Sequence, residues 1–271
     1  GDLGNQAVNN YSYDQNGQLI SDASASISQI RWNPYGKITS ITKTNGTGNI
    51  SFKYDAMGNR CSKEVNYGSG NITTTYYVRD PQGNVLATYS ENRYITSPNT
   101  FRELRMDEHN IYGSSRIGVK NSSDLIAYLV NTSNQPNPNL VSGRFSRRVL
   151  GNKAYESSNH LGNVIAVVSD RKLPVDNNSN DVIDFFVSEI LNAQDYYAFG
   201  ATMPGRAFNN GNYRYGFNGK ENDNEVKGTG SQQDYGLRIY DPRLGKFLSV
   251  DPLFRDYPWN STYAFAENSP I

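Results

Sequence analysis

Apolar and polar residues alternate with a period of two along short stretches of this chain. Ile50, Phe52 and Tyr54, for example, alternate with Ser51 and Lys53. Successive side chains of an extended strand point to opposite faces, so this pattern predicts a strand with one face turned inward. We therefore expect short β-strands over most of the chain.

Turns that end in glycine separate these strands and recur at similar intervals. The segments "YSYDQNGQLIS", "IRWNPYGKITSI", "FKYDAMGNRCS" and "YVRDPQGNVLATY" begin at residues 11, 30, 52 and 77, and "SNHLGNVIAVV" repeats the form further on. The turns open on Asp or Asn and close on glycine, at Asp14–Gly17, Asn33–Gly36, Asp55–Gly58, Asp80–Gly83 and around Gly162. Asp and Asn accept backbone hydrogen bonds at a turn start, and glycine supplies a positive φ at its end. The repetition predicts an all-β, spiralling array of antiparallel β-hairpins that stabilise one another.

Three stretches interrupt the pattern. Residues 131–139, "NTSNQPNPN", are typical of an exposed loop or an insertion. Within residues 182–193 the apolar side chains fall at helical spacing, so one short helix and a strand are both open there. Residues 221–233, "ENDNEVKGTGSQQ", are polar and contain glycine, which predicts a mobile loop.

The composition excludes some classes of protein without identifying this one. The 271 residues include 26 basic and 26 acidic side chains, so no excess of charge points to nucleic acid or to an anionic membrane. With Cys61 as its only cysteine, the chain forms no internal disulfide. No stretch is apolar enough to span a membrane, and the first residues lack a signal pattern. We expect the chain to be a piece of a longer protein, so its export route stays open.

Two Asp-Pro pairs in "YDPRLGKFLSVDP" (240–252) form the main candidate for chemistry. If a hairpin opposes Asp241 and Asp251, their Cβ atoms lie roughly 4.5–5.5 Å apart. Two carboxylates held that close share a proton and supply an acid and a base for peptide hydrolysis. The alternative is that each Asp opens and caps its own turn, or pairs with Arg243 or Lys246. Both hypotheses stay open at this point.

A second candidate site is a calcium loop in "DNNSNDVID" (176–184). Asp176, Asn178, Asn180 and Asp184 fall at positions 1, 3, 5 and 9 of such a loop. Position 6 is Asp rather than Gly, and position 12 is Val187, where a bidentate Glu is expected. A solvated acidic loop without Ca²⁺ is therefore the favoured interpretation, and no other cofactor is expected.

The turn series resembles the YD repeats of RHS (rearrangement hotspot) proteins. An ordered C-terminal series is more specific: "YYAFGATMPGR" (196–206), "YRYGFNGKENDNE" (213–225) and "DYGLRIYDPRLGKFLSVDPLFRDYPWNSTYAFAENSPI" (234–271). It resembles the RHS repeat-associated core domain, and "NIYGSSRIG" (110–118) is similar to its upstream companion. The resemblance implies hairpin repeats over residues 1–130, continued repeats with loop insertions over 131–206, and a C-terminal plug over 207–271.

The resemblance also implies a function. In RHS proteins the repeats form a shell around a variable C-terminal polypeptide, often a toxin, and many members release it by aspartate-dependent autoproteolysis. Arg238, Asp241 and Asp251 match the positions implicated, although Arg238 needs a bulge or a kink at Pro242 to reach the other two. The family's scissile bond follows an Asp-Pro-x-Gly-Leu-like element beyond the Asn-x-Pro that matches residues 268–270, and that element is not in this sequence.

Three hypotheses follow. The first is a shell segment of a secreted or surface bacterial protein, whose partners are a C-terminal effector in the same polypeptide and the upstream repeats or second chain that complete the wall. The second is a self-cleaving aspartyl protease that acts once in the full-length parent, the isolated piece being no enzyme. The third is a surface binding or adhesion module, or a component or client of a bacterial secretion apparatus, without catalysis.

Overall fold

A computed structural model describes residues 7–96, 99–131, 139–140, 148–209 and 213–270. One antiparallel sheet, which we call the wall, comprises fifteen strands. They are β1 (Tyr11–Tyr13), β2 (Leu19–Asp22), β3 (Ile27–Trp32), β4 (Ile38–Lys43), β5 (Asn49–Tyr54), β6 (Arg60–Gly68), β7 (Asn71–Arg79), β8 (Val85–Thr96), β9 (Asn99–Tyr112), β10 (Arg116–Asn131), β11 (Asn139–Leu140), β12 (Lys153–Ser158), β13 (Val164–Val175), β14 (Phe185–Tyr196) and β15 (Thr202–Asn209).

The wall is a meander in which each strand pairs with the next one along the chain. The order is β1 to β10, then β12 to β15, with β11 paired to β10 off this path. All these pairings are antiparallel. The prediction of an all-β array of antiparallel hairpins is therefore confirmed.

The repeated turns have one geometry. In each, the N–H of the closing glycine donates to the carbonyl oxygen of the opening Asp or Asn at 3.0 Å, and the residue after the glycine donates its N–H to the side-chain Oδ1 of that same residue at 2.8–3.0 Å. The glycine φ angles lie between +71° and +90°. The five turns begin at Asp14, Asn33, Asp55, Asp80 and Asn159.

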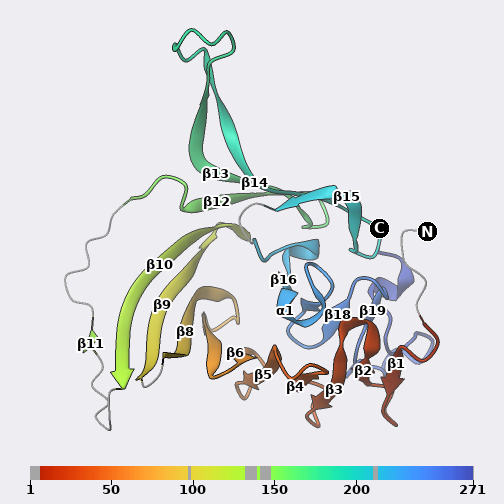
Figure 1. Ribbon diagram of the computed structural model, residues 1–271. Helices are drawn as coiled ribbons and strands as arrows, with labels where there is room; N and C mark the ends of the chain where they lie inside the picture. Colours follow the sequence, from red (N-terminus) through yellow and green to blue (C-terminus); the bar gives the residue numbers. More distant parts are fainter. Residues whose placement is uncertain (1–6, 97–98, 132–138, 141–147, 210–212, 271) are drawn as a thin grey trace.

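Residues 213–270, which we call the plug, lie inside the curve of the wall (Figure 1). They contain a small antiparallel sheet of β16 (Glu221–Asn222), β17 (Gln233–Asp234), β18 (Ile239–Asp241) and β19 (Lys246–Phe247), and a one-turn helix, α1 (Asn224–Lys227). Three short 3-10 turns, one in the wall and two in the plug, complete the elements of the described residues: η1 (Ala23–Ala25), η2 (Phe217–Gly219) and η3 (Ala266–Asn268).

In the interrupting stretches the structure selects the strand of the two alternatives for residues 182–193 and shows that the expectation for residues 221–233 is wrong. The helix considered for residues 182–193 does not form: residues 181–184 end a turn, and β14 begins at Phe185 and pairs with β13 and β15. Residues 221–233 are no mobile loop, since they form β16, α1 and part of β17 and bury Asp223, Val226 and Gln232. Their polar side chains meet polar partners from the wall, which composition alone does not reveal. The third stretch, 131–139, lies mostly outside the described residues.

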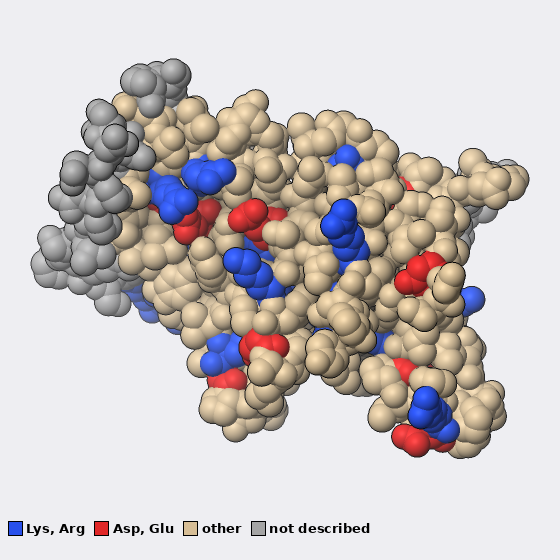
Figure 2. Space-filling view, turned by 90° about the horizontal axis from the view of Figure 1, so that it is seen from below, with Lys and Arg blue, Asp and Glu red and all other residues tan. Residues whose placement is uncertain are grey.

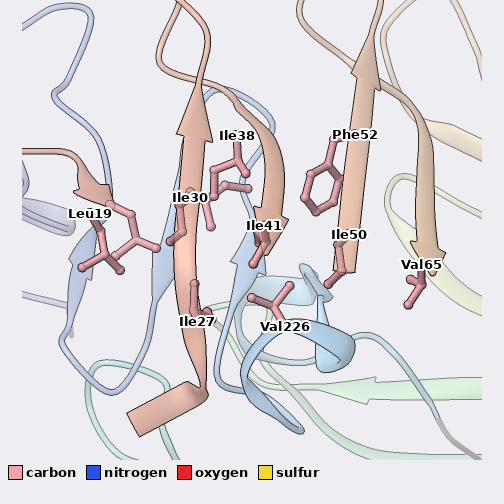
Figure 3. Close-up of a cluster of buried hydrophobic side chains, with 11 residues drawn as sticks. Leu19, Ile27, Ile30, Ile38, Ile41, Ile50, Phe52, Val65 and Val226 are labelled. Atoms are coloured by element: carbon pink, nitrogen blue, oxygen red, sulfur yellow. The ribbon is translucent and has the colours of Figure 1, made fainter. Parts of the chain in front are cut away.

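The main apolar core joins the concave face of the wall to the plug (Figure 3). Each of its members is at most 5% exposed. The wall contributes Leu19, Ile27, Ile30, Ile38, Ile41, Ile50, Phe52 and Val65, and the plug contributes Val226, Ile239 and Leu248. Because the plug supplies one side of this core, burial of apolar surface stabilises wall and plug as a unit.

Candidate functional site

A buried ion pair joins the wall to the plug at the start of β6. Both terminal nitrogens of the Arg60 guanidinium donate to the Asp223 carboxylate, at 2.8 Å each. The two side chains are 1% and 0% exposed. Burial opposes the charged form of Asp223, but Arg60 and Lys63 outweigh it and hold its pKa well below the usual range. The bidentate geometry fixes the plug against the wall at this point.

Lys63, on the same strand, extends this contact. Its Nζ lies 3.3 Å from Oδ1 of Asp223 and 3.1 Å from Oε2 of Glu225. Arg214, within the plug, binds Glu225 through both terminal nitrogens, at 2.7 and 3.0 Å. Burial disfavours the charged form of Glu225, yet these cations lower its pKa to about 2. We call Arg60, Lys63, Arg214, Asp223 and Glu225 the ionic interface.

Arg60 is unusual for its position in the repeat. Counted from the residue that opens each repeated turn, Arg60 occupies the sixth position, where the other turns have Leu19, Ile38, Val85 and Val164. Leu19, Ile38 and Val164 are buried there, as is Arg60 at 2% exposure. A charged residue at a repeat position that is otherwise aliphatic indicates a buried partner of opposite charge elsewhere in the chain.

Asp241, the first residue of the predicted catalytic pair, lies in a second buried ionic cluster. Lys227 Nζ is 2.8 Å from its Oδ2 and 2.9 Å from Oδ2 of Asp22 on β2. All three side chains are at most 3% exposed. Burial opposes the charge on Lys227, but Asp241 and Asp22 raise its pKa above the usual value. Asp241 thus takes part in holding the plug to the first hairpin of the wall.

Asp251, the second predicted residue, pairs with Arg238. Arg238 NH2 is 2.8 Å from Asp251 Oδ2, and the side chains are 15% and 31% exposed. The guanidinium carbon also lies 3.7 Å from the ring centre of Phe247. Hollows of about 1,130 and 400 Å³ adjoin Asp251, one toward the wall turns at Gly36 and Gly58 and one within the plug. Asp251 therefore borders both hollows, and Arg238 borders the one within the plug.

The strand register separates the two aspartates of the predicted pair. Asp241 on β18 pairs with Lys246 on β19, whereas Asp251 lies beyond β19 and its N–H donates to Thr262. Each also opens a turn: Asp241 Oδ1 accepts the N–H of Leu244, and Asp251 Oδ1 accepts that of the residue two positions on. The structure thus brings Arg238 to Asp251 and places Asp241 with Lys227. The predicted catalytic role of these residues stays a prediction.

The proposed calcium loop forms the turn between β13 and β14. Asp176 accepts backbone N–H groups of Asn178, Asn180 and Asp181. Asn178, Asn180 and Asp184 likewise accept backbone N–H groups of the loop. Within the described residues no group of three or more His, Cys, Asp or Glu side chains is arranged to hold a metal ion. These hydrogen bonds account for the loop's composition, and Ca²⁺ binding stays a prediction.

One partly buried carboxyl of the wall faces the plug. Glu108, on β9, accepts a long hydrogen bond of 3.5 Å from the hydroxyl of Tyr215. Burial and the nearby Glu221 raise the pKa of Glu108 to about 7, against the opposing effects of Arg214 and Arg116. Part of the wall–plug contact therefore titrates near neutral pH.

The charge on the surface is mixed. On the face seen in Figure 2, Lys and Arg are interspersed with Asp and Glu. This agrees with the equal numbers of basic and acidic residues in the sequence. Across the described ranges, no helix has the length and apolar character needed to cross a membrane.

Two curated proteins are similar to the chain over nearly its whole length. No family model matches the chain. Over 96% of its length the chain is 24% identical to salivary gland surface protein 1 from Aedes aegypti, and over 96% it is 27% identical to the tRNA3(Ser)-specific nuclease WapA from Bacillus spizizenii. It spans only 6% and 9% of these two relatives.

A solved structure shows the same fold. A chain in the crystal structure of TcdB2–TccC3–Cdc42 matches with a TM-score of 0.54 at 15% identity, over 96% of this chain and 13% of that one. The TcdB2–TccC3 chains carry RHS/YD-repeat shells. This chain therefore shares its antiparallel β-hairpin fold with part of that chain, and its nearly all-β architecture is consistent with an RHS-type shell.

Proposed function

We propose that this chain is the wall-and-plug segment of an RHS-type shell, which encloses and presents a polypeptide that follows it in the same protein. The observation that carries this proposal is the plug itself, held inside a curved wall by buried ions. Arg60 and Lys63 anchor it at β6, and Asp22 anchors it at β2. A plug fixed at separate points of the wall is suited to closing one end of a chamber.

The likeness to a TcdB2–TccC3 chain and to WapA supports a toxin-related shell. The name of the mosquito relative supports a secreted or surface location. The resemblance to RHS proteins is the reason why we propose a bacterial origin. The nuclease activity in WapA's name belongs to a protein of which this chain matches 9%. We therefore assign this chain the enclosing role and no nuclease role.

The test uses the natural polypeptide that contains this chain, with the segments that precede and follow it. Limited proteolysis followed by mass spectrometry should leave the following segment intact while the shell is folded. Asp223→Ala should expose that segment, because it removes the carboxylate that fixes the plug to Arg60. Asp234→Ala is the matched control, since Asp234 contacts Arg60 at 3.2 Å from a more exposed position. Rapid digestion of the following segment in the wild type would refute enclosure.

Release of the enclosed polypeptide by autoproteolysis is the second part of the proposal. The pairing of Arg238 with Asp251 beside two hollows supports it. Asp251→Asn in the natural polypeptide should leave it uncut while the thermal unfolding temperature stays near that of the wild type. Asp241→Asn should lower that temperature, because it weakens the buried contact with Lys227. Normal cleavage in Asp251→Asn would exclude Asp251 as a catalytic residue.

A further inference from the structure

The hairpin of β13 and β14 projects from the body of the molecule (Figure 1). β12 pairs with β13 only as far as Ser169, and β15 pairs with β14 only from Asn192. Among the described residues, the outer halves of these strands, 171–175 and 185–189, therefore pair only with each other. We call these outer halves and their connecting turn the ribbon. A two-stranded ribbon is marginally stable in water unless its apolar side chains find a partner.

Four apolar side chains gather on one face of the ribbon, whereas the opposite face combines Pro174 and Phe186 with Lys172 and Ser188. Leu173 pairs with Val187, and Val175 pairs with Phe185, so these four side chains lie on the same side. Leu173, Phe185 and Val187 are 38%, 47% and 41% exposed. We call this set the apolar ribbon face. Exposed apolar side chains gathered on one face mark an interaction surface.

The charge of the ribbon changes along its length. Its turn, 176–184, contains three aspartates and no Lys or Arg. Its base carries Arg171 and Lys172, and Arg171, 51% exposed, also pairs with Glu189. The base is therefore positive by one charge and the turn negative by three.

We propose that the occupant of the apolar ribbon face is the ribbon of a second copy of this chain, packed antiparallel. In that arrangement Val187 of each copy meets Phe185 of the other, and Leu173 meets Val175. The positively charged base of each copy then lies beside the acidic turn of the other copy. The surface is thus complementary to itself about a two-fold axis, as a symmetric dimer requires.

The antiparallel direction also suits the shape of the molecule. Parallel packing would bring the two bodies side by side and set each acidic turn against the other, whereas antiparallel packing leaves the bodies at opposite ends. Each strand of the ribbon is about 17 Å long for five residues. An interface of this size falls at the low end of specific interfaces, so the dimer is expected to be weak and reversible.

Sedimentation velocity of the 271-residue chain tests self-association, and the test does not rest on the proposed function because the ribbon lies away from the plug. From about 1 µM to about 1 mM, the wild type should shift from monomer to dimer. Val187→Ser should raise the dissociation constant at least about tenfold, since the change removes apolar contact in both copies. Met57→Ser is the matched control, because Met57 is 77% exposed on a distant turn and should change nothing.

Cross-linking tests the direction of packing. In a Cys61→Ser background, Val187→Cys and Phe185→Cys chains are mixed and treated with a short bifunctional maleimide. The mixture should give a linked dimer, and neither variant alone should do so to the same extent. Linkage of Val187→Cys to Leu173→Cys instead would indicate parallel packing and overturn the proposal.

Three further results would also overturn it. One is a wild type that stays monomeric over the whole concentration range. Another is a dimer that Val187→Ser leaves unchanged. The third is a monomer that binds vesicles of phosphatidylcholine and phosphatidylglycerol through Val187, which would identify lipid as the occupant.

Discussion

Arg60 occupies a position at which the other repeats bury an aliphatic residue. The carboxylate of Asp223 in the plug pairs with it. Removing a guanidinium from water is costly, and the attraction to Asp223 offsets that cost only when the pair is complete. The pair therefore makes the wall depend on the plug. An aliphatic side chain could also be buried at this position, but it would not fix the position of the plug, because apolar contacts are not directional.

Removing one partner of this pair should be strongly destabilising. Asp223→Ala leaves Arg60 buried without its bidentate acceptor, so the free energy of unfolding should fall by about 3–5 kcal/mol. Asp234→Ala should cost less, because Asp234 lies farther from Arg60, at 3.2 Å, and its side chain is 12% exposed. Urea unfolding monitored by circular dichroism measures both. Equal losses would mean that the bidentate contact has no special weight.

Glu108 should make stability depend on pH near neutrality. Its pKa is about 7 in the folded protein and near the ordinary 4.5 when unfolded, so folding binds a proton between these values. The contribution of Glu108 to the free energy of unfolding is complete below about pH 4.5. It decreases as the pH rises through 7, by about 3 kcal/mol in all. Glu108→Gln should therefore stabilise the protein at pH 8 and have little effect at pH 5. Urea midpoints across this range test it, and parallel curves for both proteins would contradict it.

Among elements, the first repeated turn has a role beyond closing its hairpin. Gly17 has a φ of +73°, and a Cβ there would lie 2.0 Å from the hydroxyl of Tyr263 in the plug. That hydroxyl donates to the carbonyl oxygen of Asn16. Gly46 has a similar φ of +71° but open space around it. Substitution at Gly46 therefore tests backbone strain alone, whereas substitution at Gly17 tests strain together with steric contact with the plug.

Gly46→Ala should cost about 1–2 kcal/mol, the penalty of a left-handed residue with a Cβ. Gly17→Ala should cost more, because the new methyl group also displaces Tyr263. The difference in thermal unfolding between the two variants measures the contact of the turn with the plug. In a Tyr263→Phe background this difference should shrink, and an unchanged difference would locate the clash elsewhere.

The hairpin array could be predicted from the sequence because each turn is determined by residues within the turn itself. Asp55 and Gly58 determine their turn through bonds within a few residues, and the alternation of Ile50 and Phe52 with Ser51 and Lys53 marks the inward face. The pattern over 182–193 left helix and strand both open because apolar residues stand on both faces of an exposed ribbon, which mimics helical spacing. Periodicity distinguishes strand from helix only where one face is buried.

The candidate site was less accessible to sequence reasoning, because its contacts join distant residues. Asp241 meets Asp22 through Lys227, and Arg60 meets Asp223 across more than half of the chain. Spacing around a hairpin gives no information on such pairs. It suggested Asp241 opposite Asp251, whereas the register places Lys246 opposite Asp241. The contact of Arg238 with Asp251 likewise depends on how the chain turns after β19.

For the whole molecule, wall and plug share one core and one set of buried charges, and this predicts a single cooperative unit. The wall's Ile41 and the plug's Val226 belong to the same apolar cluster, so neither can be exposed without the other losing contact. Native-state hydrogen exchange should give amides of β4 and β18 the same free energy of opening. The ribbon, whose side chains are largely exposed, should open at a lower free energy.

In Asp223→Ala, β4 and β18 should lose protection together, by the same amount as the loss in global stability. If β18 opened well before β4 in the wild type, the plug would be a separately folding lid, and closure of the wall would not depend on the buried charges.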